Sequence, residues 1–357
     1  MRLFKNISGK LALALAVISA GMVSCNEKMP LAEPIPNPSA TGSTIADLVT
    51  ADTSYSFLLA LINRAGLTSF FASRDNNMTV FAPNNNAFRL SGIPSTAVIN
   101  GLPVATAQAL VNYHLIPGEQ FTAARITTAF PNVQLPSNIN LLAPYVKLSL
   151  FPSRRSAGAW VNQIPITATD IKAANGVVHS VAAVLNPPAT TLLGIAAADT
   201  NFQFLVAAIV RADSGVAAGS RLQDALNNPL ASLTVFAPVN NAFRAVFVAL
   251  GLPPETSSFN FIPVSVVRGI VAFHVLGVRA FSPNLPLGDS QVPTLIGPPP
   301  NPQLQLRVSS TSVQARGAGN VVPGTTTQFY ANVTTANVHA INGVIHVVNA
   351  VLLPLPL

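Results

Sequence analysis

The sequence predicts an α+β protein built from two copies of one domain. Four sequence blocks occur twice in the same order, and in each copy a helical block precedes strand-like blocks. Thirty prolines and 21 glycines among 357 residues indicate many turns and short elements. With 50% hydrophobic and only 9% charged residues, the composition excludes intrinsic disorder, a coiled coil and a charge-driven nucleic-acid binder.

Residues 1–24 are typical of a secretory signal peptide. Arg2, Lys5 and Lys10 precede an apolar run at 11–23, which is shorter than the ~20 residues that a membrane-spanning helix needs. Without these three charges, 16 basic groups face 12 acidic groups, a net charge of +4 over the rest of the chain. Such a balance makes no polyanion-binding patch, so we expect no nucleic-acid partner.

Cys25 is the only cysteine, and it follows Met22-Val23-Ser24 directly. This segment resembles a bacterial lipobox, with Met22 where leucine is usual, and the resemblance implies diacylation of Cys25 as the mature N-terminus. A plain signal peptide followed by an incidental cysteine is the alternative. Residues 25–43 would then be a lipidated, proline-rich tether. We therefore expect an exported lipoprotein in the outer membrane or at the cell surface of a bacterium.

The duplication sets the domain boundaries. The blocks pair as 51–65 with 198–212 (nine of 15 identical), 79–88 with 234–243 (nine of ten), His114 with His274, and 175–185 with 342–352 (eight of 11). The offset between copies grows where the second gains loop residues, notably at 213–230. We predict one domain at 44–187 and another at 189–355.

Each block predicts an element. The first is an amphipathic helix that buries Phe57, Leu58, Leu61 and Ile62, can be capped by Asp52 or Thr53, and ends at Gly66. The second is a short strand that breaks at a proline before an asparagine-rich turn, and the last is a strand that starts from an Asn-Gly turn. Between them, 147–151 and 160–166 are predicted to pair as a hairpin. The expected structural positions are Phe81, Pro83, Phe88, Gly176 and His179 in the first copy, and Phe236, Pro238, Phe243, Gly343 and His346 in the second.

The TVFAP-x-N-x-AF block, the Tyr/Phe-His dipeptide and the closing NG-V-[VI]-H strand resemble the fasciclin-type domain. They occur in family order in both copies, over about 41–187 and 189–355. The resemblance implies a wedge-like β-sandwich packed with several helices in each domain. It also implies a role in cell adhesion or in contact with an extracellular matrix.

No signature of catalysis, metal binding or a cofactor is found in the sequence. Nucleophile-elbow, zinc-protease and phosphate-loop patterns are missing, and we expect no enzyme, no metal and no cofactor. His114, His179, His274 and His346 lie in apolar blocks without acidic neighbours, so we interpret them as buried histidines bonded to the backbone. His339 is expected at the surface, and Arg154-Arg155 at a solvated hairpin tip.

The resemblance also supplies candidate adhesion contacts. In animal members of the family, a Tyr-His pair with aliphatic neighbours and an Asp-Ile pair near the last strand are implicated in integrin contact. Tyr113-His114 and Asp170-Ile171 match these pairs, whereas the second copy has Phe273-His274. Their apolar neighbours favour the alternative that both motifs pack the core.

We therefore expect a membrane-anchored adhesion or ligand-binding lipoprotein that contacts a surface protein or a polysaccharide. An accessory subunit of an envelope glycan or nutrient-uptake system is one alternative, and a structural envelope spacer is another.

Overall fold

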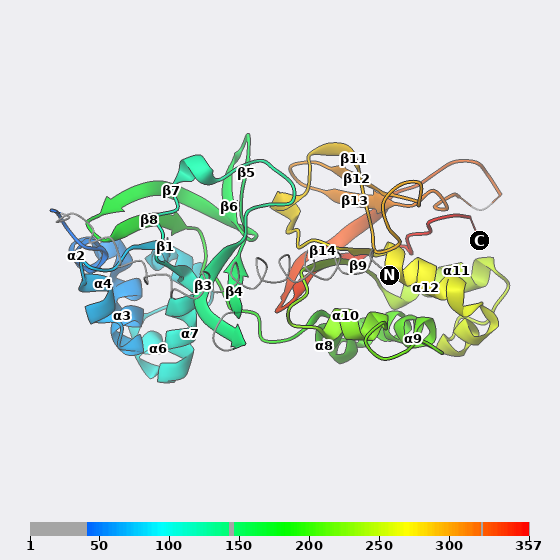
Figure 1. Ribbon diagram of the computed structural model, residues 1–357, viewed down its shortest axis with the longest axis horizontal. Coiled ribbons are helices and arrows are strands. Elements are labelled where there is room, and N and C mark those ends of the chain that lie inside the picture. Colours follow the sequence, from blue (N-terminus) through cyan, green and yellow to red (C-terminus); the bar gives the residue numbers. More distant parts are fainter. Residues whose placement is uncertain (1–40, 143–145, 323, 357) are drawn as a thin grey trace, which may run out of the picture. The chain divides into compact units, whose positions relative to one another are not determined.

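A computed structural model describes residues 41–142, 146–322 and 324–356, and from Thr41 onward the chain forms one compact unit. The predicted signal peptide, Cys25 and most of the tether lie outside the described residues. Residues 41–187 are called repeat one and residues 189–356 repeat two. In each repeat, the α-helices gather on one side of a β-sheet (Figure 1).

Repeat one begins with helices and ends with strands. Its helices are α2 (Ile45–Ala51), η1 (Thr53–Tyr55), α3 (Ser56–Ala65), α4 (Thr68–Ala72), α5 (Asn85–Leu90), α6 (Thr96–Gly101), α7 (Val104–His114) and η2 (Ala123–Arg125). Its strands are β1 (Met78–Pro83), β2 (Leu115–Pro117), β3 (Leu135–Leu142), β4 (Val146–Leu150), β5 (Pro152–Arg155), β6 (Gly158–Val161), β7 (Ile164–Ala173) and β8 (Gly176–Val181).

Repeat two follows the same order. Its helices are α8 (Leu192–Ala198), η3 (Thr200–Phe202), α9 (Gln203–Ala212), α10 (Leu222–Asn227), α11 (Asn240–Ala249), η4 (Thr256–Phe261), α12 (Val264–Phe273) and η5 (Ser282–Asn284). Its strands are β9 (Leu233–Pro238), β10 (Val275–Leu276), β11 (Gly288–Val292), β12 (Leu304–Val308), β13 (Val313–Arg316), β14 (Ala331–Ala340) and β15 (Gly343–Val348). The predicted α+β class is confirmed.

The two sheets share one central arrangement. The strand orders are β2-β1-β8-β7-β6-β5 in repeat one and β10-β9-β15-β14-β13-β12-β11 in repeat two. In both, the TVFAP strand pairs in parallel with the last strand, so that Phe81 lies opposite His179 and Phe236 opposite His346. The strongest sequence repeats therefore form the middle of each sheet.

The asparagine of each Asn-Gly turn does more than begin a strand. Asn175 is fully buried; its Oδ1 accepts from Ile45 N, and its Nδ2 donates to the carbonyls of Phe71 and Ser73. Asn342 is buried in the same way and bonds the start of α8 and the end of α10. One side chain thus ties two helix ends to the sheet in each repeat, because buried amide groups must be hydrogen-bonded.

The core of repeat one has two layers, one on each face of the sheet. Helices α3 and α7 bury residues such as Leu61 and Val111 against one face, and Phe88 of α5 is buried there too. On the other face, Leu148 and Leu150 of β4 pack with Phe81. The helix α3 ends at Gly66 as predicted (φ 72°), whereas Asp52 caps the short η1 turn in front of it.

The predicted hairpin between 147–151 and 160–166 is wrong. Strand β4 pairs with β3 in a separate two-stranded sheet, whereas β6 pairs with β5 and β7. The sequence pattern indicates two strand-like segments but not how they pair. In the structure, the turn after Arg155 joins β5 to β6 in a shorter hairpin. Register was decided by this local turn.

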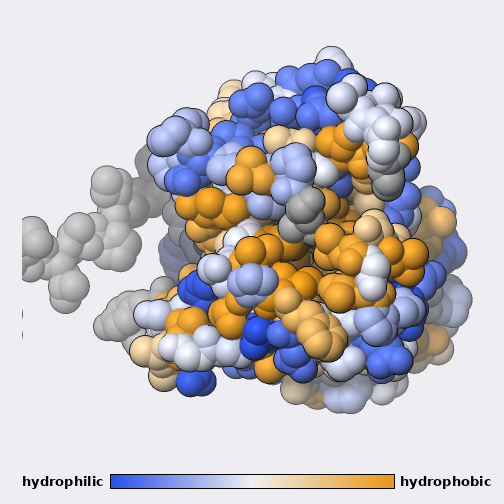
Figure 2. All heavy atoms as spheres, turned by 90° about the vertical axis from the view of Figure 1, so that its right-hand side faces the viewer, coloured by the Kyte–Doolittle hydropathy of each residue, from blue (hydrophilic) through white to orange (hydrophobic). Residues whose placement is uncertain are grey.

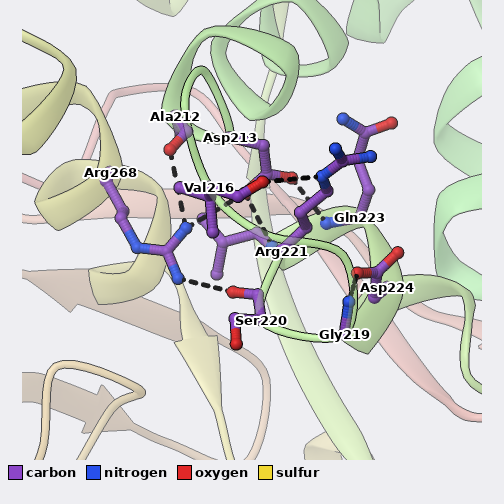
Figure 3. A network of polar contacts seen from close by, with 10 residues as sticks. Ala212, Asp213, Val216, Gly219, Ser220, Arg221, Gln223, Asp224 and Arg268 are labelled. Atoms are coloured by element: carbon purple, nitrogen blue, oxygen red, sulfur yellow. Dashed lines mark hydrogen bonds and ion pairs between the residues drawn. The ribbon is translucent and has the colours of Figure 1, made fainter.

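The longer loop of repeat two is held by one buried carboxylate (Figure 3). Asp213, 6% exposed, accepts from the backbone N–H groups of Leu222 and Gln223 at 2.7 and 2.9 Å. Its Oδ1 also lies 3.0 Å from Arg268 Nη1, and Arg268 donates to Ser220 O. The insertion is therefore an ordered part of the fold.

No single helix among the described residues is long and apolar enough to cross a membrane. Two sharply bent pairs reach that length and composition only when they are combined: Ile45–Ala51 with Thr53–Ala65, and Leu192–Ala198 with Thr200–Ala212.

Candidate functional site

His114 and His274 join a helix end to the segment that follows the last strand. Nδ1 of His114 donates to Leu110 O (2.8 Å), and its Nε2 accepts from Leu185 N (2.9 Å). His274 makes the same pair of bonds, at 2.7 and 2.9 Å. Since a carbonyl only accepts and a backbone N–H only donates, both rings are held as the neutral Nδ1–H tautomer. Burial lowers the pKa of each imidazole to about 4.

His179 and His346 lie on the last strands and anchor a loop in each repeat. Nε2 of His179 donates to Phe121 O, and its Nδ1 accepts from Asp170 N. Nε2 of His346 donates to Ala280 O, but its buried Nδ1 has no hydrogen-bond partner. Burial lowers the pKa of both rings, that of His346 to about 4, while the Asp170 carboxylate partly opposes the shift at His179.

All the hydrogen bonds described for these four histidines join an imidazole nitrogen to a backbone group. Within residues 41–142, 146–322 and 324–356, no group of three or more histidine, cysteine, aspartate or glutamate side chains could hold a metal ion. The remaining structural positions are equally internal: Phe81, Phe88, Phe236, Phe243, Gly176 and Gly343 are buried, as are Pro83 and Pro238 at the ends of their strands.

Tyr113 lies where the two repeats meet. It has no exposed surface; its hydroxyl donates to Ser149 O and accepts from Asn162 Nδ2, both at 3.3 Å. Burial raises the pKa of the phenol, and its ring centroid is 6.4 Å from that of His339 in repeat two. Phe273 is likewise fully buried. Packing accounts for both positions, and contact with a partner stays a prediction that requires these side chains to become accessible.

The expectation that His339 is exposed is wrong. Its ring packs edge-on against Phe281 at 5.0 Å, and its Nε2 is buried without a partner. Burial, reinforced by the nearby Arg279 cation, lowers its pKa to about 3. The sequence could not show this, since Phe281 lies far from His339 along the chain and Tyr113 approaches it from the other repeat.

We call the contact between the repeats the interrepeat joint; it comprises Tyr113, Phe151 and Arg155 from repeat one, and Arg279, Phe281 and His339 from repeat two. The Arg279 guanidinium lies 5.0 Å from the centroid of the Phe151 ring and donates to Ile341 O. Burial lowers the pKa of Arg279 to about 10, so it stays charged at neutral pH.

Arg154-Arg155 does lie at a hairpin tip, but only Arg154 is exposed. Arg155 donates to the carbonyls of Ser282 and Leu285 in repeat two, and burial lowers its pKa. The expectation of a solvated doublet is therefore wrong for Arg155. Side-chain length allows the guanidinium to reach backbone carbonyls across the joint.

Asp170 and Ile171 are half-buried. Asp170 has a left-handed backbone (φ 58°) at an irregularity in β7, and its carboxylate accepts from Ala123 N at 2.8 Å. Asn337 repeats this geometry in β14 (φ 67°) and accepts from Ser282 N. Aspartate and asparagine both tolerate the left-handed backbone conformation, which explains why these two residue types occupy the aligned positions 170 and 337. Their contact with a partner stays a prediction.

Repeat two carries an apolar cleft of about 690 Å³ that no sequence pattern indicated. Figure 2 shows apolar side chains gathered around a hollow on this face. One wall is α11, and the other is formed by residues of 319–322 and 324–329 together with residues of 349–356, which follow β15. Its lining includes Ala242, Ala245, Val246, Ala249, Val321, Phe329, Val351 and Leu353.

The matching place in repeat one is a hollow of about 520 Å³ with a different lining. Val184, which aligns with Val351, lines it together with Ser91, Asn162 and Gln163. Asn337 and His339 of repeat two also line this hollow. Repeat two therefore contributes to the hollow of repeat one, whereas the lining of the apolar cleft comes from repeat two alone.

Comparisons with known proteins agree with this architecture. Residues 53–187 and 214–354 each match the family model described as Fasciclin domain. The transforming growth factor-beta-induced protein ig-h3 of Sus scrofa is 32% identical over 149 residues, which are 41% of this chain and 20% of that protein. Protein sll1483 of Synechocystis is 30% identical over 180 residues, covering 50% of this chain and 91% of that protein.

A solved FAS1 domain pair from the insect cell adhesion molecule fasciclin I covers 83% of this chain and 95% of its own, at 18% identity and a TM-score of 0.36. This chain spans about a fifth of the length of the mammalian relative. Fasciclin domains are associated with adhesion or ligand binding and are typically found in extracellular or surface proteins. The two family matches together cover well over half of the chain. The chain therefore belongs to the fasciclin family and carries two fasciclin domains in tandem.

Proposed function

We propose that this chain is an exported, lipid-anchored protein that binds a surface protein or a polysaccharide through its two fasciclin domains. The observation that carries the proposal is that the buried histidines use their ring nitrogens for hydrogen bonds within the fold. His114, His179, His274 and His346 each hold backbone groups inside the fold, and this structural role supports a function that depends on surface contact. The association of fasciclin domains with adhesion supports the same conclusion.

The anchor is proposed from the sequence around Cys25. Two or more acyl chains on this residue would give stable membrane attachment, whereas a single chain binds only marginally. Cys25→Ser should move the protein from the membrane fraction to the soluble fraction. Retention of the variant in membranes after a high-salt wash would contradict the lipid anchor and leave the binding proposal to be tested separately.

Binding can be tested with an array of glycans and matrix proteins, with Asp170→Asn as the diagnostic variant. Asn337 already makes the equivalent backbone contact in repeat two, so asparagine should preserve the bond to Ala123 N while it removes the charge. If Asp170 contacts the partner, binding should weaken at least tenfold at an unchanged melting temperature.

Asn337→Asp is the matched control, because it adds a carboxylate at the same bulge in the other repeat. Unchanged binding by Asp170→Asn would exclude Asp170 as a contact. Absence of any ligand on the array would count against an adhesive function.

A further inference from the structure

We infer that the apolar cleft of repeat two binds a hydrocarbon chain, such as the acyl chain of a single lipid molecule. This goes beyond the proposed function, because it requires neither the anchor nor a surface partner. The volume of about 690 Å³ lies within the range of small-molecule sites.

The shape of the cleft suits an elongated ligand. Ala242, Ala245 and Ala249 recur at helical spacing and so line one face of α11. They extend over about 10 Å at the rise of an α-helix. Methyl side chains leave open the space that leucines would occupy, and Phe329 and Leu353 bound the cleft as well.

Several polar side chains of the walls are already bonded within the protein. Asn320 Oδ1 accepts from the N–H groups of Gly317 and Leu353, and its Nδ2 donates to Val351 O. Thr325 Oγ1 donates to Val322 O. None of the described residues that line the cleft is charged. A peptide segment in extended form would bring backbone N–H and C=O groups that these walls leave unpaired, whereas a hydrocarbon chain brings none.

A second copy docked head to tail fits poorly. In repeat one, the matching hollow is lined by Asn337 and His339 of the following repeat. If a second copy docked its repeat one against the apolar cleft in the same way, Asp170 and Lys172 would take the places of Asn337 and His339. Both residues are charged, and the lysine is exposed. The described lining residues of the cleft carry no charge that could pair with the aspartate or the lysine, and burying an unpaired charge is strongly unfavourable.

The test uses the exported chain carrying Cys25→Ser, so that no attached lipid competes. The probe is cis-parinaric acid below its critical micelle concentration, followed by fluorescence and displaced by palmitate. We expect saturable binding at one site per chain. Ala249→Phe should fill the cleft and weaken binding at least tenfold; because Ala249 is exposed, the melting temperature should not change.

Ala105→Phe is the matched control, since Ala105 is also an exposed alanine on a helix, in α7 of repeat one. This variant should bind as the parent does. Absence of saturable binding, or equal binding by Ala249→Phe, would overturn the inference. Self-association of the ligand-free chain that Ala249→Phe abolishes would also overturn it, because a second copy would then occupy the cleft.

Discussion

The hollow beside the last strand has opposite character in the two repeats. In repeat one, Ser91 lines it and its Oγ accepts from Val184 N at 2.9 Å. In repeat two, the aligned residue is Val246, and α11 has ten residues where α5 has six. The same fold therefore supports a polar hollow at the joint and an apolar cleft elsewhere. Residues that face the interior are repeated, whereas residues that face a neighbour or solvent have diverged.

The largest expected effect is acid destabilisation that affects repeat two first. His114, His274 and His346 have folded pKa values of about 4 against about 6.5 when unfolded. The unfolded chain thus binds more protons between these values, so stability is fully present above pH 6.5 and falls as the pH approaches 4. For each ring, the free energy of unfolding should fall by about 1.4 kcal/mol for every pH unit of acidification between pH 6.5 and pH 4.

Two of these three rings belong to repeat two, whereas the Asp170 carboxylate opposes the pKa shift of His179 in repeat one. Trp160, the only tryptophan, reports on repeat one, and far-ultraviolet circular dichroism reports on both repeats. On acidification, the dichroism should change before Trp160 fluorescence. Constant stability from pH 7 to pH 5 would contradict the buried-neutral assignment.

Removing one bridging histidine should destabilise its own repeat by about 3 kcal/mol. His114→Ala strands Leu110 O and Leu185 N, and His274→Ala strands the matching pair, at about 1–3 kcal/mol for each buried group. Denaturant unfolding should show similar losses for both variants. Full stability with lost adhesion in His114→Ala would instead assign this residue to a contact site.

A methyl group at the turn glycines should cost about 2 kcal/mol in either repeat, as expected for overpacking. A Cβ at Gly176 would lie 2.2 Å from Met78 O, and one at Gly343 would lie 2.4 Å from Leu233 O. Gly269→Ala in α12 is the control, because it meets nothing within 4 Å and should be neutral or stabilising. A large difference between the two turn variants in thermal unfolding would break the equivalence of the repeats.

The smallest effect, about 1 kcal/mol, is expected for Tyr113→Phe, which makes repeat one resemble repeat two. The variant loses the hydroxyl that bonds Ser149 O and Asn162, both at a long 3.3 Å. Chemical denaturation followed by Trp160 fluorescence measures the loss. A loss of unfolding free energy above 3 kcal/mol would mean that this hydroxyl organises the whole interrepeat joint. Its role would then exceed that of a hydrogen-bond partner for Ser149 and Asn162.

The repeated blocks were sufficient to predict the α+β class, the central strands and the buried histidines. Each depends on local pattern: alternating or helical apolar spacing, a proline that breaks a strand and an Asn-Gly turn that starts one. The pairing of β4 was mispredicted because strand-like composition does not specify which neighbour a strand meets.

The sequence by itself determined the duplication and the interior of each repeat, because the same buried environment selects the same residues twice. Only the tertiary structure decided where His339, Arg155 and the apolar cleft lie. His339 is covered by Phe281 and approaches Tyr113, and the cleft is formed by α11 and a segment some 80 residues later. Burial and cavities arise from contacts between segments distant in sequence, so no local pattern encodes them.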